Sequence, residues 1–224
     1  EITTRLVGSE MCIRDRGMAV IMVFTALYGY RGRSGSLHEL TFLSNFLSGV
    51  FLSLTFFFRR SGRKVPQILY FDCMMLLFLV LIVCAAFTGV FKFNGMFFCL
   101  HMLNPLLMIF YYFLFCDMNR VQKTRQILSA LAAPMLYLVF AAGYGKVTGD
   151  SIYFFLNVKK YGYGYCVSFI TVLFAAVVMI GCAMFFLNRI IQNNSPFRFN
   201  KRKERSYITS AKSALDSTVS NAIK

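Results

Sequence analysis

The chain of 224 residues contains no tryptophan, only 9 acidic residues and only 2 histidines. Charged residues make up 15% of it and hydrophobic residues 58%, a balance that excludes an ordinary soluble domain. Two histidines are too few for a typical histidine-based metal centre. We therefore expect neither a metal ion nor a cofactor.

Several common enzyme motifs are also missing. The chain has no glycine-rich phosphate loop, no H-E-x-x-H helix, no G-x-S-x-G turn and no acidic pair placed for a metal. There is no C-x-x-C pair either, and six of the seven cysteines lie in apolar runs, as small core residues do. Nucleotide-binding, zinc-protease and serine-hydrolase classes are therefore not indicated.

Long apolar runs separated by short polar links dominate the sequence. About 20 consecutive apolar residues are needed to cross a bilayer as a helix. We predict an all-α polytopic membrane protein, with a domain over residues 17–190 that forms a bundle of six transmembrane helices. The expected spans are 17–30, 37–58, 66–88, 94–116, 126–144 and 163–187.

The beginning of the chain does not resemble the rest. Residues 6–16 resemble a translated sequencing adapter, so we expect residues 1–16 to be a non-native leader. The apolar run 17–30 would then be only about 21 Å long as a helix, against about 30 Å for a span. The first helix is therefore expected to be truncated. The alternative is the core of a signal peptide, although no small-x-small cleavage signal follows.

The net charge of +15 is concentrated in the links and in the final segment. Of the Lys and Arg residues outside the leader, thirteen fall on one side of the predicted bundle up to residue 205 and six on the other. The positive-inside rule predicts that both termini are cytoplasmic in a plasma-membrane protein. We expect residues 191–224 to be a disordered basic tail that contacts anionic lipid headgroups, with membrane lipids rather than nucleic acid as partners.

Two spans carry polar side chains on one face. His101 and Asn104 are three residues apart, and Thr41, Asn45 and Ser48 follow offsets of four and seven. Both spans run inward from the outer face, which places Thr41 about 6 Å and His101 about 10 Å below the outer boundary. We therefore predict that the two side chains can meet.

A hydroxyl beside an imidazole is the minimal pair for nucleophilic attack on an acyl carbon, because the neutral ring takes the hydroxyl proton. Thr41 and His101 are our catalytic candidates, with His38 as an alternative base. The competing interpretation is that the pair hydrogen-bonds only to hold two helices together.

Three further polar residues, Asn45, Ser48 and Asn104, are candidates for the wall of a substrate pocket, although such residues also join membrane helices. Asp72 lies near the opposite end of the bundle from His101. An intramembrane carboxylate is a functional candidate, and its alternative is an ion pair with a base such as Arg125.

Several segments appear in an order that resembles uncharacterised bacterial six-helix membrane proteins, distant relatives of the androgen-induced and androgen-dependent TFPI-regulating membrane proteins of animals. The segments are 40–47, 101–107, 134–138, 148–149 and 153–158. The resemblance covers roughly residues 17–190. The animal proteins place an acidic residue after their proline segment, where this chain has residues 109–112, Ile-Phe-Tyr-Tyr.

That resemblance implies an intramembrane hydrolase of fatty-acid esters. The threonine nucleophile of the animal family matches Thr41, and its histidine matches His101. No other functional residue carries over. The alternative is a non-catalytic membrane protein, either a small transporter or a lipid-binding module, in which Asp72 would matter most.

Overall fold

The structure is a computed structural model that describes residues 2–32, 34–61, 63, 65–88, 95–121 and 124–194. These residues form helices and connections, with no β-strand among them. Five helical segments within them are long and apolar enough to cross a membrane, so the chain is a helical membrane protein. They are Leu40–Phe58, Gln67–Ala86, Gly95–Phe115, Arg125–Thr148 and Val158–Asn194.

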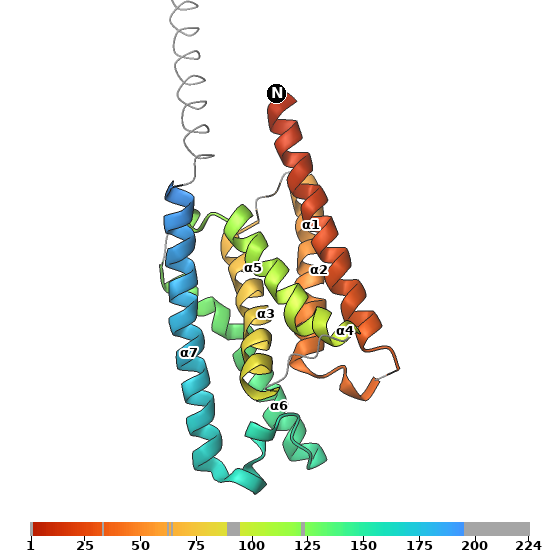
Figure 1. Cartoon of the computed structure of the whole chain (residues 1–224), viewed down its shortest axis with the longest axis vertical. Helices are drawn as coiled ribbons and strands as arrows, with labels where there is room; N and C mark the ends of the chain where they lie inside the picture. Colours follow the sequence, from red (N-terminus) through yellow and green to blue (C-terminus); the bar gives the residue numbers. More distant parts are fainter. Residues whose placement is uncertain are drawn as a thin grey trace, which may run out of the picture.

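The helices form one bundle with α1 and α7 at opposite flanks (Figure 1). Helix α1 (Ile2–Gly29) packs along α2 (Leu40–Arg60), while α3 (Gln67–Thr88) contacts α2, α5 (Asn104–Phe115) and α7 (Val158–Asn194). The start of α1 and the end of α7 lie at the same end of the bundle (Figure 1). The connection between α1 and α2 therefore lies at the other end, where α2 begins with Leu40 and Thr41.

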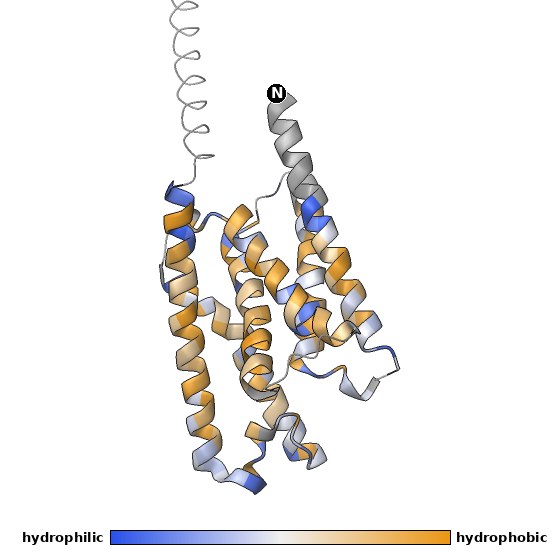
Figure 2. Ribbon diagram, viewed as in Figure 1, coloured by the Kyte–Doolittle hydropathy of each residue, from blue (hydrophilic) through white to orange (hydrophobic). Residues whose placement is uncertain are grey.

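Hydrophobic residues cover most of α3 and α7, and hydrophilic ones gather at the helix ends (Figure 2). Large apolar side chains such as Leu136, Val139 and Val172 are more than two-thirds exposed. In water this exposure would be unfavourable, but in a bilayer these side chains face lipid. The polar backbone groups are meanwhile satisfied within the helices.

Helix α1 is longer than the apolar run 17–30, because it begins at Ile2. It therefore extends through the segment that the sequence predicts to be a leader. Asp15 of that segment is fully buried, where it accepts hydrogen bonds from the hydroxyls of Thr55 and Tyr111. The non-native origin of residues 1–16 stays a prediction, as does truncation of the first span.

The fourth predicted span, 94–116, is helical over Gly95–Phe115 but not α-helical throughout. Helix α4 (Gly95–Phe98) passes into a π-helical turn, η2 (Cys99–Leu103), and then into α5. Pro105 explains the turn, because it has no N–H to donate to a carbonyl of the preceding turn. The backbone N–H of Asn104 bonds to Cys99, five residues back, which widens the helix there.

The fifth and sixth predicted spans differ from the structure at their ends. Residues Thr124–Leu131 form a 3-10 helix, η4, and α6 runs over Ala132–Thr148. Pro134 lies in the first turn of α6, a position that proline tolerates. Helix α7 has a non-helical break at Gly162 and then continues to Asn194, beyond the predicted end at 187. The rest of the predicted basic tail, from residue 195, lies outside the described residues.

Two glycines permit close helix packing where a side chain would not fit. A Cβ atom on Gly49 of α2 would lie 3.0 Å from the backbone nitrogen of Val23 in α1. A Cβ atom on Gly29 would lie 2.7 Å from a methyl group of Leu100. The first contact brings α2 against α1, and the second brings the π-helical turn against the end of α1.

Candidate active site

Thr41 and His101 meet at the end of the bundle where α2 begins. The hydroxyl oxygen of Thr41 lies 3.3 Å from Nε2 of His101, which confirms the prediction that the two side chains converge. Thr41 is 8% exposed. The His101 side chain is partly exposed, so the pair can be approached from outside the bundle.

The second ring nitrogen of His101 fixes which nitrogen carries the proton. Nδ1 lies 3.0 Å from the carbonyl oxygen of Phe97, and a carbonyl can only accept. In the neutral ring the proton is therefore on Nδ1, and the lone pair of Nε2 faces Thr41. The Phe97 ring stacks on the imidazole at 4.1 Å between centroids and limits its rotation. This arrangement gives His101 the tautomer of a general base.

The position of Thr41 in its helix keeps its hydroxyl available. Most helical threonines here donate to the carbonyl one turn earlier, as Thr25 does to Ile21 and Thr171 to Val167. Thr41 is the second residue of α2, so the carbonyl four residues back precedes the helix. The hydroxyl of Thr41 lies beside both Nε2 of His101 and the hydroxyl of Tyr30, and it can donate to His101.

The π-helical turn that carries His101 is held by Asn45. The carbonyl of Leu100 loses its helical partner because the N–H of Asn104 bonds to Cys99 and Pro105 has no N–H. The side-chain amide of Asn45 replaces that partner at 3.2 Å and also donates to the Thr41 carbonyl at 2.8 Å. One side chain thus ties the nucleophile's helix to the base's helix.

Asn104 extends this connection to α1. Its amide donates to the hydroxyl of Thr25 and to the side-chain oxygen of Asn45, each at 2.7 Å. Asn45 and Asn104 are both fully buried, and their bonds join α1, α2 and α5. The contacts that the structure gives these residues are between helices, while their predicted role in a substrate pocket stays a prediction.

Ser48 is the third predicted pocket residue, one turn beyond Asn45 on α2. It is 1% exposed, and the thiol of Cys73 on α3 lies beside its hydroxyl. The side-chain oxygen of Asn104 has no hydrogen-bond partner within the described part of the chain. Buried polar atoms are almost always hydrogen-bonded. In this network, the Ser48 hydroxyl and the side-chain oxygen of Asn104 are therefore the atoms that can still bind a polar group of a ligand.

Glu39 supplies a negative charge to the site, which the sequence reasoning missed. It precedes α2 and interacts electrostatically with His101. Its carboxylate accepts a hydrogen bond of 2.8 Å from the hydroxyl of Tyr30, which orients it.

Two tyrosine hydroxyls meet at the residue before Thr41. The backbone N–H of Leu40 lies 3.1 Å from the hydroxyl of Tyr137 in α6 and 3.2 Å from that of Tyr153 in the following loop. Both hydroxyls accept there, and they also share a hydrogen bond with each other, which leaves one hydroxyl hydrogen of the pair to donate elsewhere. Burial raises the pKa of Tyr153. One signal could have found these two residues, because both lie in segments on which the resemblance rests.

The other sequence candidates lie elsewhere. His38 stacks on Tyr144 at 4.5 Å between ring centroids, and in the described part of the chain no hydrogen bond links it to Thr41. Asp72 accepts a 2.7 Å hydrogen bond from the hydroxyl of Ser129 instead of pairing with Arg125. His101, unlike His38 and Asp72, hydrogen-bonds to Thr41 in the described part of the chain, because the π-helical turn places its imidazole opposite that residue.

Comparisons with protein-family models, with curated proteins and with solved structures found no match for this chain. The site is therefore interpreted from its own geometry.

Proposed function

We propose that the chain is an intramembrane hydrolase of fatty-acid esters in which Thr41 is the nucleophile and His101 the general base. The observation that carries the proposal is the pair of bonds on the imidazole. Nδ1 donates to the carbonyl of Phe97, while Nε2 faces the Thr41 hydroxyl at 3.3 Å. A merely structural bond between two helices does not require the proton to be held on Nδ1.

The first half of the reaction forms an acyl-threonine. The oxygen of Thr41 attacks the ester carbonyl carbon while its proton passes to Nε2 of His101. The tetrahedral intermediate then collapses, the bond to the leaving oxygen breaks, and His101 returns the proton to that oxygen. The negative charge of Glu39 stabilises the imidazolium that exists between the two proton transfers.

The developing oxyanion needs a donor near Thr41. We assign this role to the hydroxyl pair of Tyr137 and Tyr153, which converges on the residue before the nucleophile and can donate the hydrogen that the bond between the two tyrosines leaves free. In the second half, His101 takes a proton from water as the water oxygen attacks the acyl carbon. Collapse of that intermediate releases the fatty acid and restores the threonine hydroxyl.

The membrane placement belongs to the same proposal. Together with α1, the five apolar segments would make six spans in the plasma membrane. An even number of spans would put both termini on the same side, and the positive-inside rule makes that side the cytoplasm. The site would then open at the outer leaflet. Substrate esters would enter laterally from lipid, since the exposed side chains of the bundle are apolar.

Labelling with an activity-directed fluorophosphonate tests the proposal. Purified protein should be labelled at Thr41, and Thr41→Ala and His101→Ala should each abolish labelling while the variants remain folded. Ser44→Ala is the matched control, because Ser44 is also a buried hydroxyl of α2 but bonds to the Thr41 carbonyl. Labelling that persists in both active-site variants would remove the mechanism.

The alternative function is a small transporter or lipid-binding module, and the observation that favours it is the carboxylate of Asp72 inside the span Gln67–Ala86. Asp72→Asn separates the two. It should leave labelling unchanged if the chain is a hydrolase, and it should lower flux into liposomes if the chain is a transporter.

A further inference from the structure

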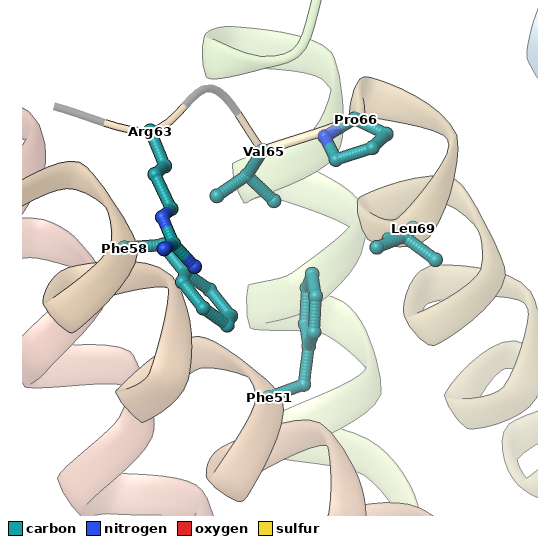
Figure 3. Close-up of a pocket in the computed structure, with 6 residues that line it drawn as sticks. All are labelled: Phe51, Phe58, Arg63, Val65, Pro66 and Leu69. Carbon is teal, nitrogen blue, oxygen red and sulfur yellow. The ribbon is translucent and has the colours of Figure 1, made fainter. Parts of the chain in front are cut away.

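A second region suited to a ligand lies at the connection between α2 and α3, at the opposite end of α2 from Thr41. It is a partly open groove with a cavity volume of about 220 Å³, lined by Phe51, Phe58, Arg63, Val65, Pro66 and Leu69 (Figure 3). Five of these six residues are apolar. No residue of the proposed active site contributes to it.

The groove combines an apolar wall with a cation at one end. Phe51 and Phe58 are seven residues apart on α2, which is about 10 Å along the helix axis. Arg63 and Val65 extend from the connection toward these two rings (Figure 3). The groove thus begins at the membrane boundary, where α2 ends, and reaches along the apolar span Leu40–Phe58.

The sequence of the connection beside the groove is strongly basic. Four of the six residues 59–64 are basic in the sequence, and none of the six groove residues is acidic. Arg63 is exposed, and no carboxylate pairs with it in the part of the chain that the structure describes. A guanidinium in this setting matches a phosphate group, to which it can donate two parallel hydrogen bonds.

We propose that this groove binds one anionic phospholipid from the membrane leaflet at the α2–α3 connection. Arg63 holds the phosphate of the headgroup, and one acyl chain lies between Phe58 and Leu69 toward Phe51. A free phosphate would use the arginine but leave the apolar wall without a role. A zwitterionic lipid such as phosphatidylcholine also offers a phosphate, but its own choline cation offsets the negative charge, so an anionic headgroup is favoured beside Arg63.

The absence of tryptophan allows a direct test. Phe58→Trp places a single indole in the groove of the full chain, reconstituted in phosphatidylcholine vesicles. A fixed fraction of either phosphatidylglycerol or phosphatidylcholine then carries brominated acyl chains that quench the indole on contact. Brominated phosphatidylglycerol should show an apparent association about fivefold stronger than brominated phosphatidylcholine. Leu69→Trp, on the opposite wall, is a second reporter if Phe58→Trp does not fold.

Matched variants make the result specific. Phe57 is 60% exposed and does not line the groove, so Phe57→Trp should show no such preference. Adding Arg63→Gln to the groove reporter should remove the preference, whereas adding Arg125→Gln should keep it. Together these results support a lipid held by Arg63 in the groove.

Four results would overturn the proposal. Equal quenching by the two lipids would show that the groove does not select charge. The same preference in Phe57→Trp would show diffuse attraction to the basic connection, and a preference that survives Arg63→Gln would exclude the assigned cation. Loss of the preference in millimolar inorganic phosphate would indicate a site for a free anion rather than a lipid.

Discussion

The side-chain amide of Asn45 lies 3.2 Å from the carbonyl oxygen of Leu100, a carbonyl that the proline at 105 leaves without a helical donor. A backbone carbonyl that lacks a donor in its own helix thereby accepts a hydrogen bond from a side chain of α2. The same Asn45 amide also donates to the carbonyl of Thr41. These two hydrogen bonds together set the separation between the proposed nucleophile, Thr41, and its base, His101.

Pro105→Ala should separate stability from activity. The added N–H allows the π-helical turn to relax to α-helix, which rotates His101 away from Thr41. We expect fluorophosphonate labelling to fall about 10- to 100-fold, while the free energy of unfolding stays the same or rises by up to about 3 kcal/mol. Pro134→Ala, in the first turn of α6, is the control. Unchanged labelling in Pro105→Ala would contradict the role given to the turn.

Asn45→Leu and Asn104→Leu should each destabilise the bundle, because each leaves the other's buried polar group unpaired. The expected cost is about 1–3 kcal/mol for each single variant. A double-mutant cycle, measured by unfolding in SDS, should give a coupling of about 0.6–1.7 kcal/mol. Thr171→Val, which removes an exposed hydroxyl bonded within its own helix, should change little. Additive effects of the two asparagine variants would argue against a direct bond.

Glu39→Gln should slow catalysis without weakening substrate binding. Loss of the negative charge near His101 removes stabilisation of the imidazolium, which forms only during the reaction. With a 4-nitrophenyl ester of a long-chain fatty acid, we expect kcat to fall about tenfold and KM to stay unchanged. Asp150→Asn, at an exposed carboxylate of the connection between α6 and α7, is the control. A rise in KM alone would assign Glu39 to binding instead.

Tyr137→Phe with Tyr153→Phe should remove the proposed oxyanion donor. The double variant should lower kcat about 10²- to 10³-fold with the same ester. It also leaves the N–H of Leu40 without its two acceptors, so the thermal midpoint should fall as well. Tyr144→Phe is the comparison, since the ring of Tyr144 stacks on His38 in the same region. A lowered midpoint with normal kcat would leave the tyrosines a structural role only.

Gly49→Val should disrupt the packing of α1 against α2. Its Cβ would lie 2.7 Å from a methyl group of Val23 and 3.0 Å from that residue's backbone nitrogen, so the helices must separate. We expect a loss of about 1–3 kcal/mol in the free energy of unfolding. Gly143→Val in α6 is the control, because nothing lies within 4 Å of the added Cβ. Equal losses in both variants would reflect helix propensity rather than packing.

The amino-acid sequence by itself determined the helical membrane class and the approximate spans, because apolar runs of bilayer length have few other stable conformations. It also predicted that Thr41 and His101 can meet, because both spans were expected to run in the same direction with the two residues at similar offsets from their starts. Helix ends near Pro134 and at Asn194 were less predictable, because they depend on local 3-10 geometry and packing.

Only the tertiary structure decided which way the side chains face. The proton position on His101, the bridge made by Asn45 and the convergence of Tyr137 and Tyr153 on Leu40 all depend on rotation about helix axes and on loops that return to the bundle. A one-dimensional pattern fixes a helix's apolar face only within a wide stripe. Hydrogen bonds between helices, and between α2 and the loop that carries Tyr153, then select one arrangement within that stripe, and they involve residues up to 113 positions apart.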